Sequence, residues 1–327
     1  MQGSQAVFIV GYPRSDTKLL RGLLNNHPHI SLGDEGNFIP LLIDQFGIGA
    51  NVSDTHMWPK IYQAYRTTAD YNTQKSRGKE PSETAFLRFL ETRKSQSEDI
   101  SWADILEGLF RASSAKENSL IFGDKSHNYV QHVPLIRSIF TDVRFILIIR
   151  DPRDQALSVA KTWGRNPLRS AQGWSAMARK AEKYDLNKAH DSITVRYEDL
   201  TADPHKELDR ICTLLQIPSI PELAVLKKSV EPKHLNRHFS DVVSQSAKYK
   251  QAFPPKTIKN ISEITLPYLA TYGYPDEGAT RHRELGKFRL KWLKYRDGLA
   301  SLLYHMREKR ILAGFTYYRR RHFEAGS

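Results

Sequence analysis

The apolar residues of the chain form short runs that alternate with longer amphipathic stretches. Residues 6–10 (AVFIV), 144–149 (RFILII) and 192–196 (SITVR) are rich in β-branched and aromatic residues, which is typical of strands. Apolar residues at helical spacing follow at 19–24 and at 208–215, so we expect a helix at each place. The second run is almost continuously apolar, as strands of a parallel sheet covered on both faces are. Strands that alternate with helices predict an α/β domain of three layers around a central parallel sheet.

The rest of the chain is less regular. Residues 47–100 are polar and weakly periodic, and we expect loops and helices over one face of the sheet there. Residues 275–278 (PDEG) break the pattern, so we expect one domain over residues 1–277 and a helical C-terminal extension over residues 278–327. In the extension, apolar residues recur at alternating spacings of 3 and 4, which is the seam of a coiled coil. The seam consists of Leu285, Phe288, Trp292, Tyr295, Leu299, Leu302 and Met306.

Positive charge is concentrated in this extension. The chain has a net charge of +13, and the residues from Arg281 onward contribute 13 Lys and Arg against 4 Asp and Glu, or +9. The body is nearly neutral, so we expect no nucleic-acid partner, and we expect any anionic partner at the tail. Three interpretations of the basic amphipathic tail are open: packing on the domain, a homodimer through the helix, or contact with an anionic surface. The narrow seam favours the first two.

The cellular location is inferred from what the sequence contains. No stretch approaches the about 18 apolar residues of a membrane span, and residues 1–6 do not resemble a secretory leader. Cys212 is the single cysteine and lies in a predicted helix, where we expect it to pack in the core. We therefore expect a soluble, cytoplasmic protein.

The loop after the first strand, VGYPRSDTK at residues 10–18, has the chemistry of an anion site. A strand, a loop and a helix in this order place backbone N–H groups and a helix N-terminus against a bound anion. The nucleotide-binding pattern G-x-x-x-x-G-K-[ST] is not met, because Asp16 replaces its second glycine and Lys18 comes one position late. On the loop alone, a basic surface turn is an equal alternative. The loop supplies two cations and two hydroxyls, from Arg14, Lys18, Ser15 and Thr17.

Four segments in order resemble the sulfotransferases that use 3′-phosphoadenosine 5′-phosphosulfate (PAPS). Residues 11–28 (GYPRSDTKLLRGLLNNHP) resemble the family's 5′-phosphosulfate loop, and residues 148–158 (IIRDPRDQALS) resemble its 3′-phosphate motif. Residues 123–126 (GDKS) and 195–204 (VRYEDLTADP) match two further family segments. The resemblance extends over residues 6–274 and implies a P-loop-like α/β fold.

The similarity is greatest to the tyrosylprotein sulfotransferases and their bacterial relatives. These have R-S-G-T-T-L-M-R, then H-P, then G-E-E and I-P. This chain has residues 14–21, the pair His27-Pro28, residues 33–35 (GDE) and the pair Ile39-Pro40 at the matching places. The second glutamate of the family's pair is the catalytic base, so the resemblance implies this role for Glu35.

The resemblance also implies roles for the other matching residues. Arg14 and Lys125 stabilise charge on the sulfuryl group, and Arg150 and Ser158 bind the 3′-phosphate. Residues 14–18 hold the 5′-phosphate through their backbone N–H groups and through the hydroxyl of Thr17. Tyr197 lines the nucleotide pocket. The implied donor is PAPS, the implied product is PAP, and no metal is expected.

Three departures from the family pattern bear on these roles. Asp16 stands in place of a glycine, and although aspartate tolerates left-handed backbone, its charge repels a phosphate unless Lys18 compensates it. In residues 246–249 (SAKY) the serine is one place off and a tyrosine replaces a tryptophan, and His127 replaces a proline.

The sequence therefore predicts a sulfotransferase whose acceptor is a hydroxyl of a carbohydrate, a phenol or a protein tyrosine. One alternative is a protein of the same fold that binds the nucleotide poorly and does not turn over, because of Asp16. The other is a P-loop kinase or nucleoside triphosphatase. Against it, no lysine stands at position 17 and no Mg²⁺-binding aspartate is evident on the second predicted strand.

Overall fold

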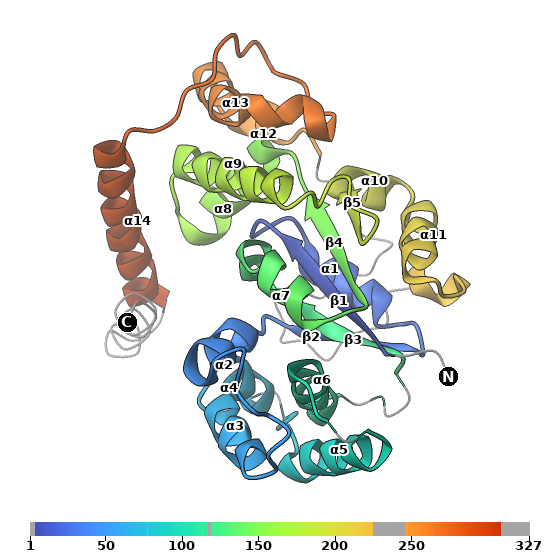
Figure 1. Cartoon of the computed structure of the whole chain (residues 1–327). Coiled ribbons are helices and arrows are strands. Elements are labelled where there is room, and N and C mark those ends of the chain that lie inside the picture. Colours follow the sequence, from blue (N-terminus) through green and yellow to red (C-terminus); the bar gives the residue numbers. More distant parts are fainter. Residues whose placement is uncertain are drawn as a thin grey trace. The chain divides into compact units, whose positions relative to one another are not determined.

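A five-stranded parallel sheet in the order β2-β3-β1-β4-β5 forms the centre of the fold (Figure 1). The structure is a computed structural model and describes residues 4–76, 78–97, 99–114, 116, 119–224 and 246–308. The sheet confirms the predicted α/β class, and three of its strands are those predicted from the apolar runs. The strands are β1 (Gln5–Gly11), β2 (Ile30–Asp34), β3 (Ile121–Lys125), β4 (Val143–Ile149) and β5 (Ser192–Arg196).

The sequence analysis missed the two strands on one side of β1. β2 (ISLGD) and β3 (IFGDK) are short, and each contains a glycine and ends in charged residues. Gly123 in β3 has a φ of 143°, and a Cβ atom there would lie 2.0 Å from the carbonyl oxygen of Val7 in β1. Only glycine lets the two backbones approach so closely.

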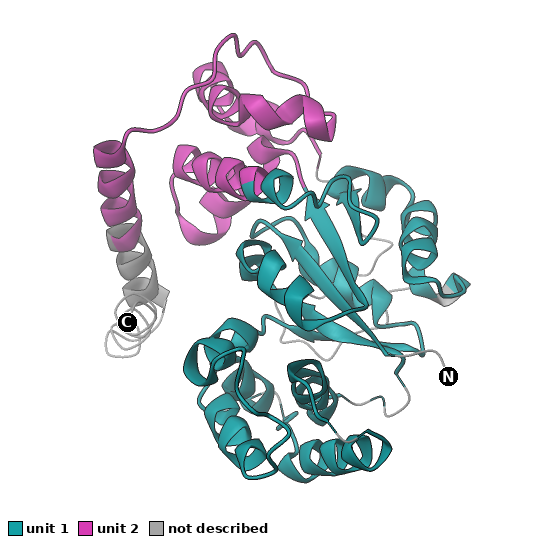
Figure 2. Ribbon diagram, in the orientation of Figure 1, with its two compact units in different colours: residues 1–149, 180–244 teal, residues 150–179, 245–327 magenta. Residues whose placement is uncertain are grey.

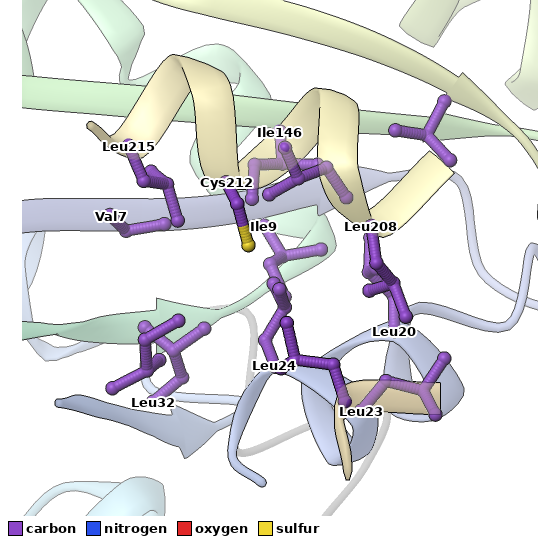
Figure 3. Packing of buried hydrophobic residues seen from close by; sticks show 14 of the residues in the cluster. Val7, Ile9, Leu20, Leu23, Leu24, Leu32, Ile146, Leu208, Cys212 and Leu215 are labelled. Carbon is purple, nitrogen blue, oxygen red and sulfur yellow. The ribbon is translucent and has the colours of Figure 1, made fainter. Parts of the chain in front are cut away.

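One face of the sheet is covered by an aliphatic core. Leucines of α1 (Thr17–Leu24) and apolar residues of α11 (Pro204–Leu215) pack against the strands there (Figure 3). Cys212 lies in this core, as expected, and burial raises the pKa of its thiol to about 11. The thiol is therefore protonated and unreactive at neutral pH. The packed residues include Val7, Ile9, Leu20, Leu23, Leu24, Leu32, Ile146, Leu208 and Leu215.

The other face of the sheet is aromatic. The ring of Phe8 in β1 contacts four rings that come from α6 (Trp102–Ala112), from η1 (His127–Gln131), from the end of α7 (Val133–Ile139) and from β4. Tilted and edge-on pairs of this kind add to the stability that burial alone provides. The four partners are Phe110, Tyr129, Phe140 and Phe145.

The polar region from residue 47 to 100 consists of loops and helices, as predicted. It follows α2 (Phe38–Phe46) and contains α3 (Met57–Arg66), α4 (Ala69–Ser76) and α5 (Glu83–Gln96). Three tyrosines of this region, Tyr62, Tyr65 and Tyr71, are buried and contact one another edge-on. They pack the region and are not available to stack on a ligand.

The chain divides into two compact units (Figure 2). Residues 1–149 and 180–244 form unit 1, which holds the whole sheet, and residues 150–179 and 245–327 form unit 2. Unit 2 is helical, and a small core from α8, α9 and α13 includes Ala156, Ala171, Ile261 and Ile264. The separate extension expected from residue 278 on stays a prediction. The remaining helices are α8 (Pro152–Trp163), α9 (Pro167–Lys183), α10 (Tyr197–Ala202), α12 (Tyr249–Ala252), α13 (Pro255–Leu269) and α14 (Lys287–Glu308).

The predicted C-terminal helix is α14, and Leu285 at the start of its apolar seam packs against the small core of unit 2, whereas the next three seam residues do not. Phe288, Trp292 and Tyr295 are exposed, whereas Leu293 and Asp297 on the opposite side are buried. The side chains of Leu299, Leu302 and Met306, and all residues from 309 on, lie outside the described part. Among the described helices, none has the length and the apolar character needed to cross a membrane.

Candidate functional site

The candidate residues of unit 1 lie at the carboxyl ends of parallel strands. The loop of residues 12–16 follows β1, Glu35 follows β2, Lys125 ends β3, and Tyr197 follows β5. The strand register pairs Lys125 with Ile9 and with Asp34, so these ends meet at one edge of the sheet. After β1 the chain runs to β2 and returns to β3 on one side of β1, and it then crosses to β4 and β5 on the other side. Ligands of open α/β sheets bind at such a switch point.

The loop after β1 has an unusual backbone. Arg14 and Asp16 have positive φ angles of 72° and 60°, on either side of Ser15. Turns of this kind present successive N–H groups to an anion. Asp16 is the N-cap residue of α1 in the left-handed conformation, which aspartate tolerates, and its side chain makes no capping hydrogen bond. The first N–H groups of α1 therefore receive no cap from this side chain.

Ser15 carries the observation that most directly indicates a ligand. The residue is fully buried, and its Oγ atom has no hydrogen-bond partner within the described residues. Buried hydroxyls are nearly always hydrogen-bonded in folded proteins, because an unmet polar group destabilises the fold. An anionic oxygen bound in the loop would accept this hydrogen bond.

Asp34 holds three cations around the end of β2. Its Oδ1 atom lies 2.7 Å from Nζ of Lys125, and both side chains are only 1% exposed. Its Oδ2 atom lies 3.8 Å from Nζ of Lys18 and 3.8 Å from Nη2 of Arg21. Burial alone would raise the pKa of Asp34, but Arg21, Lys125 and Lys18 together hold this pKa well below its usual range. Lys18 thus forms an ion pair with Asp34.

Glu35 follows directly and contacts the same lysine. Its Oε1 atom accepts a hydrogen bond of 3.0 Å from Nζ of Lys125, and its backbone N–H donates to the carbonyl oxygen of Lys125 at 2.8 Å. Burial raises the pKa of Glu35, but the Lys125 ammonium outweighs burial and the net pKa is lowered. Glu35 is therefore ionised at neutral pH, and half of its side chain is exposed (51%), where it can meet a substrate.

The loop that carries Glu35 rests on a buried carboxyl group. A Cβ atom on Gly36 would lie 2.5 Å from Oδ2 of Asp124, and one on Gly33 would lie 3.3 Å from Oδ1. Burial raises the pKa of Asp124 well above its usual value, and its Oδ1 atom accepts a hydrogen bond of 2.6 Å from the backbone N–H of Lys125. The sequence analysis missed this contact, although the glycines on either side of the Asp34-Glu35 pair are a signal of close backbone approach.

Arg150 and Ser158 belong to unit 2. Arg150 is buried, and its carbonyl oxygen accepts a hydrogen bond of 3.0 Å from Nε1 of Trp174. Ser158 is half-buried on α8, two turns into the helix. The acidic neighbour Asp151 pairs with both Nε and Nη2 of Arg153 at 2.7 Å each. This carboxylate is therefore engaged by another arginine.

Asp154 anchors the segment that departs from the family pattern. Its two oxygens accept backbone N–H groups of Ala247, at 2.6 Å, and of Tyr249, at 3.0 Å. Burial raises the pKa of Asp154 to about 6. Tyr249 is buried, donates a hydrogen bond of 2.7 Å to Glu277, and lies under the guanidinium of Arg153. Sequence reasoning missed the contacts of Arg153 with Pro275 and of Asp154 with Ala247, because these partners are about 100 residues away in the chain.

The arrangement combines a carboxylate, cations and a loop of left-handed backbone within unit 1. Glu35 and Lys125 are in contact, Tyr197 is buried at the start of α10, and the loop of residues 14–18 follows the adjacent strand. Unit 2 separately supplies Arg150 and Ser158. Across the described part of the chain, no group of three or more His, Cys, Asp or Glu side chains is placed to hold a metal ion.

Comparison with known proteins gives the family. The sequence model described as "Sulfotransferase family" matches residues 6–222. The sulfotransferase domain of the olefin synthase from Synechococcus PCC 7002 has 20% identity and a TM-score of 0.53, with 84% of this chain and 97% of that chain covered. The sulfotransferase domain from the curacin biosynthetic pathway has 18% identity and a TM-score of 0.53, with 84% and 99% covered. At these identities the two structures establish a shared fold. No curated protein matches the sequence.

We predict that Asp34→Asn destabilises unit 1 and changes its response to acid. The folded pKa of Asp34 lies below its unfolded value of 3.8, so its stabilisation is present above that value and is lost as the pH falls through the folded pKa. Removing one partner of a buried ion pair costs about 3–5 kcal/mol. Urea unfolding at pH 7 should therefore show that the free energy of unfolding falls by this amount. Below about pH 4, the free energy of unfolding of the variant should depend less steeply on pH than that of the natural chain.

The matched control is Asp44→Asn, which removes an exposed carboxylate of α2. It should leave the free energy of unfolding nearly unchanged. If Asp34→Asn is equally silent, the three cations are held by other groups and the account of this cluster is wrong.

Proposed function

The chain belongs to the sulfotransferase family, and from this premise we propose that it transfers a sulfuryl group from PAPS to an acceptor hydroxyl, with PAP as the product. The observation that carries the proposal is the buried Lys125 ammonium, held by Asp34 and Glu35 next to the anion loop. Such a cation is suited to a reaction that moves negative charge. The acceptor is a hydroxyl of a carbohydrate, a phenol or a protein tyrosine.

The loop after β1 binds the 5′-phosphosulfate in this proposal. The unsatisfied Ser15 hydroxyl, the Thr17 hydroxyl and the backbone N–H groups of residues 14–18 donate hydrogen bonds to it. The N-terminus of α1 adds its positive dipole end. Arg14 is exposed and can reach the sulfuryl oxygens.

Glu35 and Lys125 carry out the transfer step. Glu35 takes the proton of the acceptor hydroxyl, the acceptor oxygen bonds to sulfur, and the bond from sulfur to the phosphate oxygen breaks with its electron pair on the departing PAP. Lys125 and Arg14 stabilise the charge that develops on the sulfuryl and phosphate oxygens. When Lys125 turns toward the donor, it contacts Glu35 less closely. The pKa of Glu35 then rises, and Glu35 becomes a stronger base when the donor is bound.

The 3′-phosphate is assigned to unit 2. Arginine binds phosphate through two parallel N–H groups, and a buried Arg150 does so in a medium of low dielectric. Ser158 adds a hydroxyl donor, and Tyr197 lines the nucleotide pocket. The proposal needs no metal, because side-chain cations and N–H groups provide the stabilisation. A cytoplasmic location agrees with the single buried, protonated cysteine.

Asp16 supports a second candidate function. It is the N-cap residue of α1, where the family pattern has a glycine, so it adds a negative charge at this helix N-terminus. A charge of this sign next to a 5′-phosphate weakens binding. The alternative is therefore a protein of this fold that binds the nucleotide poorly and has lost turnover. A kinase or triphosphatase is disfavoured, because the loop lacks the Walker lysine.

Arg150→Ala tests the nucleotide site. Titration calorimetry with PAP should show affinity falling by about 1.5–3 kcal/mol, the range for hydrogen bonds to charged groups. Arg150→Lys keeps the charge but not the forked geometry, so it should recover only part of the loss. Arg281→Ala, at an exposed position of unit 2, should leave the affinity unchanged. Equal affinities of Arg150→Ala and the natural chain would remove the 3′-phosphate assignment.

Glu35→Gln tests the base. Glutamine keeps an oxygen that can accept from Lys125, so PAP binding should persist, while the rate of sulfuryl transfer should fall by about 10²–10⁴-fold. The control is Glu91→Gln on the exposed side of α5, which should keep the full rate. A Glu35→Gln protein with most of its rate would place the base elsewhere, and His127 is the next candidate.

Asp16→Gly separates the two functions. Glycine adopts the observed φ of 60° freely and removes the charge, so PAP should bind more tightly by about 1–4 kcal/mol, depending on screening. The gain should shrink as salt is added. Asp16→Asn is the matched control, because it removes only the charge and keeps a residue that tolerates this backbone. Weaker binding by both variants would mean that Asp16 is part of the working site.

A further inference from the structure

The outer side of α14 is a continuous aromatic stripe. Phe288, Trp292 and Tyr295 follow at spacings of 4 and 3, which places them on one side of the helix. They are 92%, 58% and 74% exposed, the highest values among the exposed large hydrophobic residues of the described chain. Scattered apolar residues on a surface are common, but a contiguous stripe of three aromatic rings indicates an interaction surface.

Cations border this stripe on both sides. Lys287, Lys291 and Lys294 follow one edge of the helix, and Arg289 and Arg296 follow the other, by the helical spacing of 100° per residue. All five are exposed. The guanidinium of Arg296 lies 5.2 Å from the centre of the Trp292 ring. The surface therefore combines apolar rings at its centre with positive charge at its margins.

The opposite side of the helix fixes this orientation. Leu293 is buried, and Asp297 is only 3% exposed. Asp297 forms an ion pair of 2.7 Å with Arg169 and accepts a hydrogen bond of 2.9 Å from the backbone N–H of Asn166. Asp297 is the one acidic residue between positions 287 and 298, so the outward side of this segment carries no negative charge.

We propose that this side of α14 binds the surface of an anionic lipid bilayer, with the helix lying in the plane of the membrane. Basic amphipathic helices with Trp and Phe on the apolar side bind in this manner, and their rings reach the boundary between headgroups and acyl chains. The amphipathic rings of Trp and Tyr favour that boundary. Each Lys or Arg near an anionic surface strengthens binding by about fivefold.

Charge disfavours a second copy of the chain as the occupant. A symmetric dimer places the same patch of each copy face to face. The five cations of one helix would then face the five of its partner, with no acidic residue between positions 287 and 298 exposed to pair with them. An anionic bilayer offers an apolar boundary region for the aromatic rings and negative headgroups for the cations.

The test is sedimentation of the full-length protein with vesicles of phosphatidylcholine, with and without phosphatidylserine. The protein should bind only the vesicles that contain phosphatidylserine, and added salt should weaken the binding. Replacing the stripe (Phe288→Ser, Trp292→Ser, Tyr295→Ser) should abolish binding. Reversing two border charges (Lys291→Glu, Lys294→Glu) should weaken it by about two orders of magnitude.

Two matched controls separate this surface from general properties of the chain. Leu41→Ser with Ile48→Ser removes exposed apolar side chains from unit 1, and Lys256→Glu with Lys259→Glu makes the same charge change on α13. Both should bind vesicles like the natural chain, and circular dichroism should show unchanged helix content in every variant. Binding that survives loss of the stripe would overturn the proposal, as would a failure to bind phosphatidylserine vesicles. So would a dimer, seen by sedimentation velocity, that the stripe variant loses.

Discussion

The buried ion pair between Lys125 and Asp34 is the interaction on which the candidate site depends. Two side chains that are only 1% exposed keep their charges there, which is possible because each has a partner at 2.7 Å. The parallel register sets this distance, because Asp34 and Lys125 are direct neighbours at the ends of β2 and β3. The sheet thus delivers a charged lysine to its carboxyl edge, and the next residue along the chain after Asp34, Glu35, meets the same ammonium.

Three residues in the loops that follow β1 and β2 have strained backbone conformations. Arg14, Asp16 and Glu35 all have positive φ angles, although none is glycine. Left-handed backbone costs about 1–2 kcal/mol per ordinary residue, so packing must hold each of them in place. At Glu35 the holding contacts are visible: its N–H donates to the carbonyl oxygen of Lys125, and Gly36 lies against Asp124. The loop of Glu35 is therefore held in place by contacts within unit 1, and such positioning in advance suits the role proposed for Glu35.

The sequence predicts those parts of the fold in which local pattern and tertiary packing agree. β1 and β4 are apolar because they are buried in the sheet, whereas β5 is marked by its β-branched residues and only Val195 in it is buried. The α/β class follows from these three runs. β2 and β3 escape the pattern because their last residues serve the candidate site, so Asp34 and Lys125 stand where apolar residues would mark a strand. The four family segments give the candidate residues, but not Asp34 as the group that pairs with the three cations. That role depends on three contacts made across the fold, which no local spacing reveals.

In α14, tertiary contacts rather than the apolar pattern of the sequence determine which side of the helix is buried. A seam of apolar residues predicts that this seam is buried, because hydrophobic contact normally decides which side of a helix packs. Here Asp297 determines which side of α14 is buried, since its carboxylate forms an ion pair with Arg169 and accepts a hydrogen bond from the backbone N–H of Asn166. Exposing this carboxylate would break a buried pair, and the three aromatic rings are left on the outside in consequence. The same principle acts at both ends of the chain, since Asp34 in unit 1 and Asp297 in unit 2 each fix, by one buried carboxylate, where positive charge and apolar surface are presented.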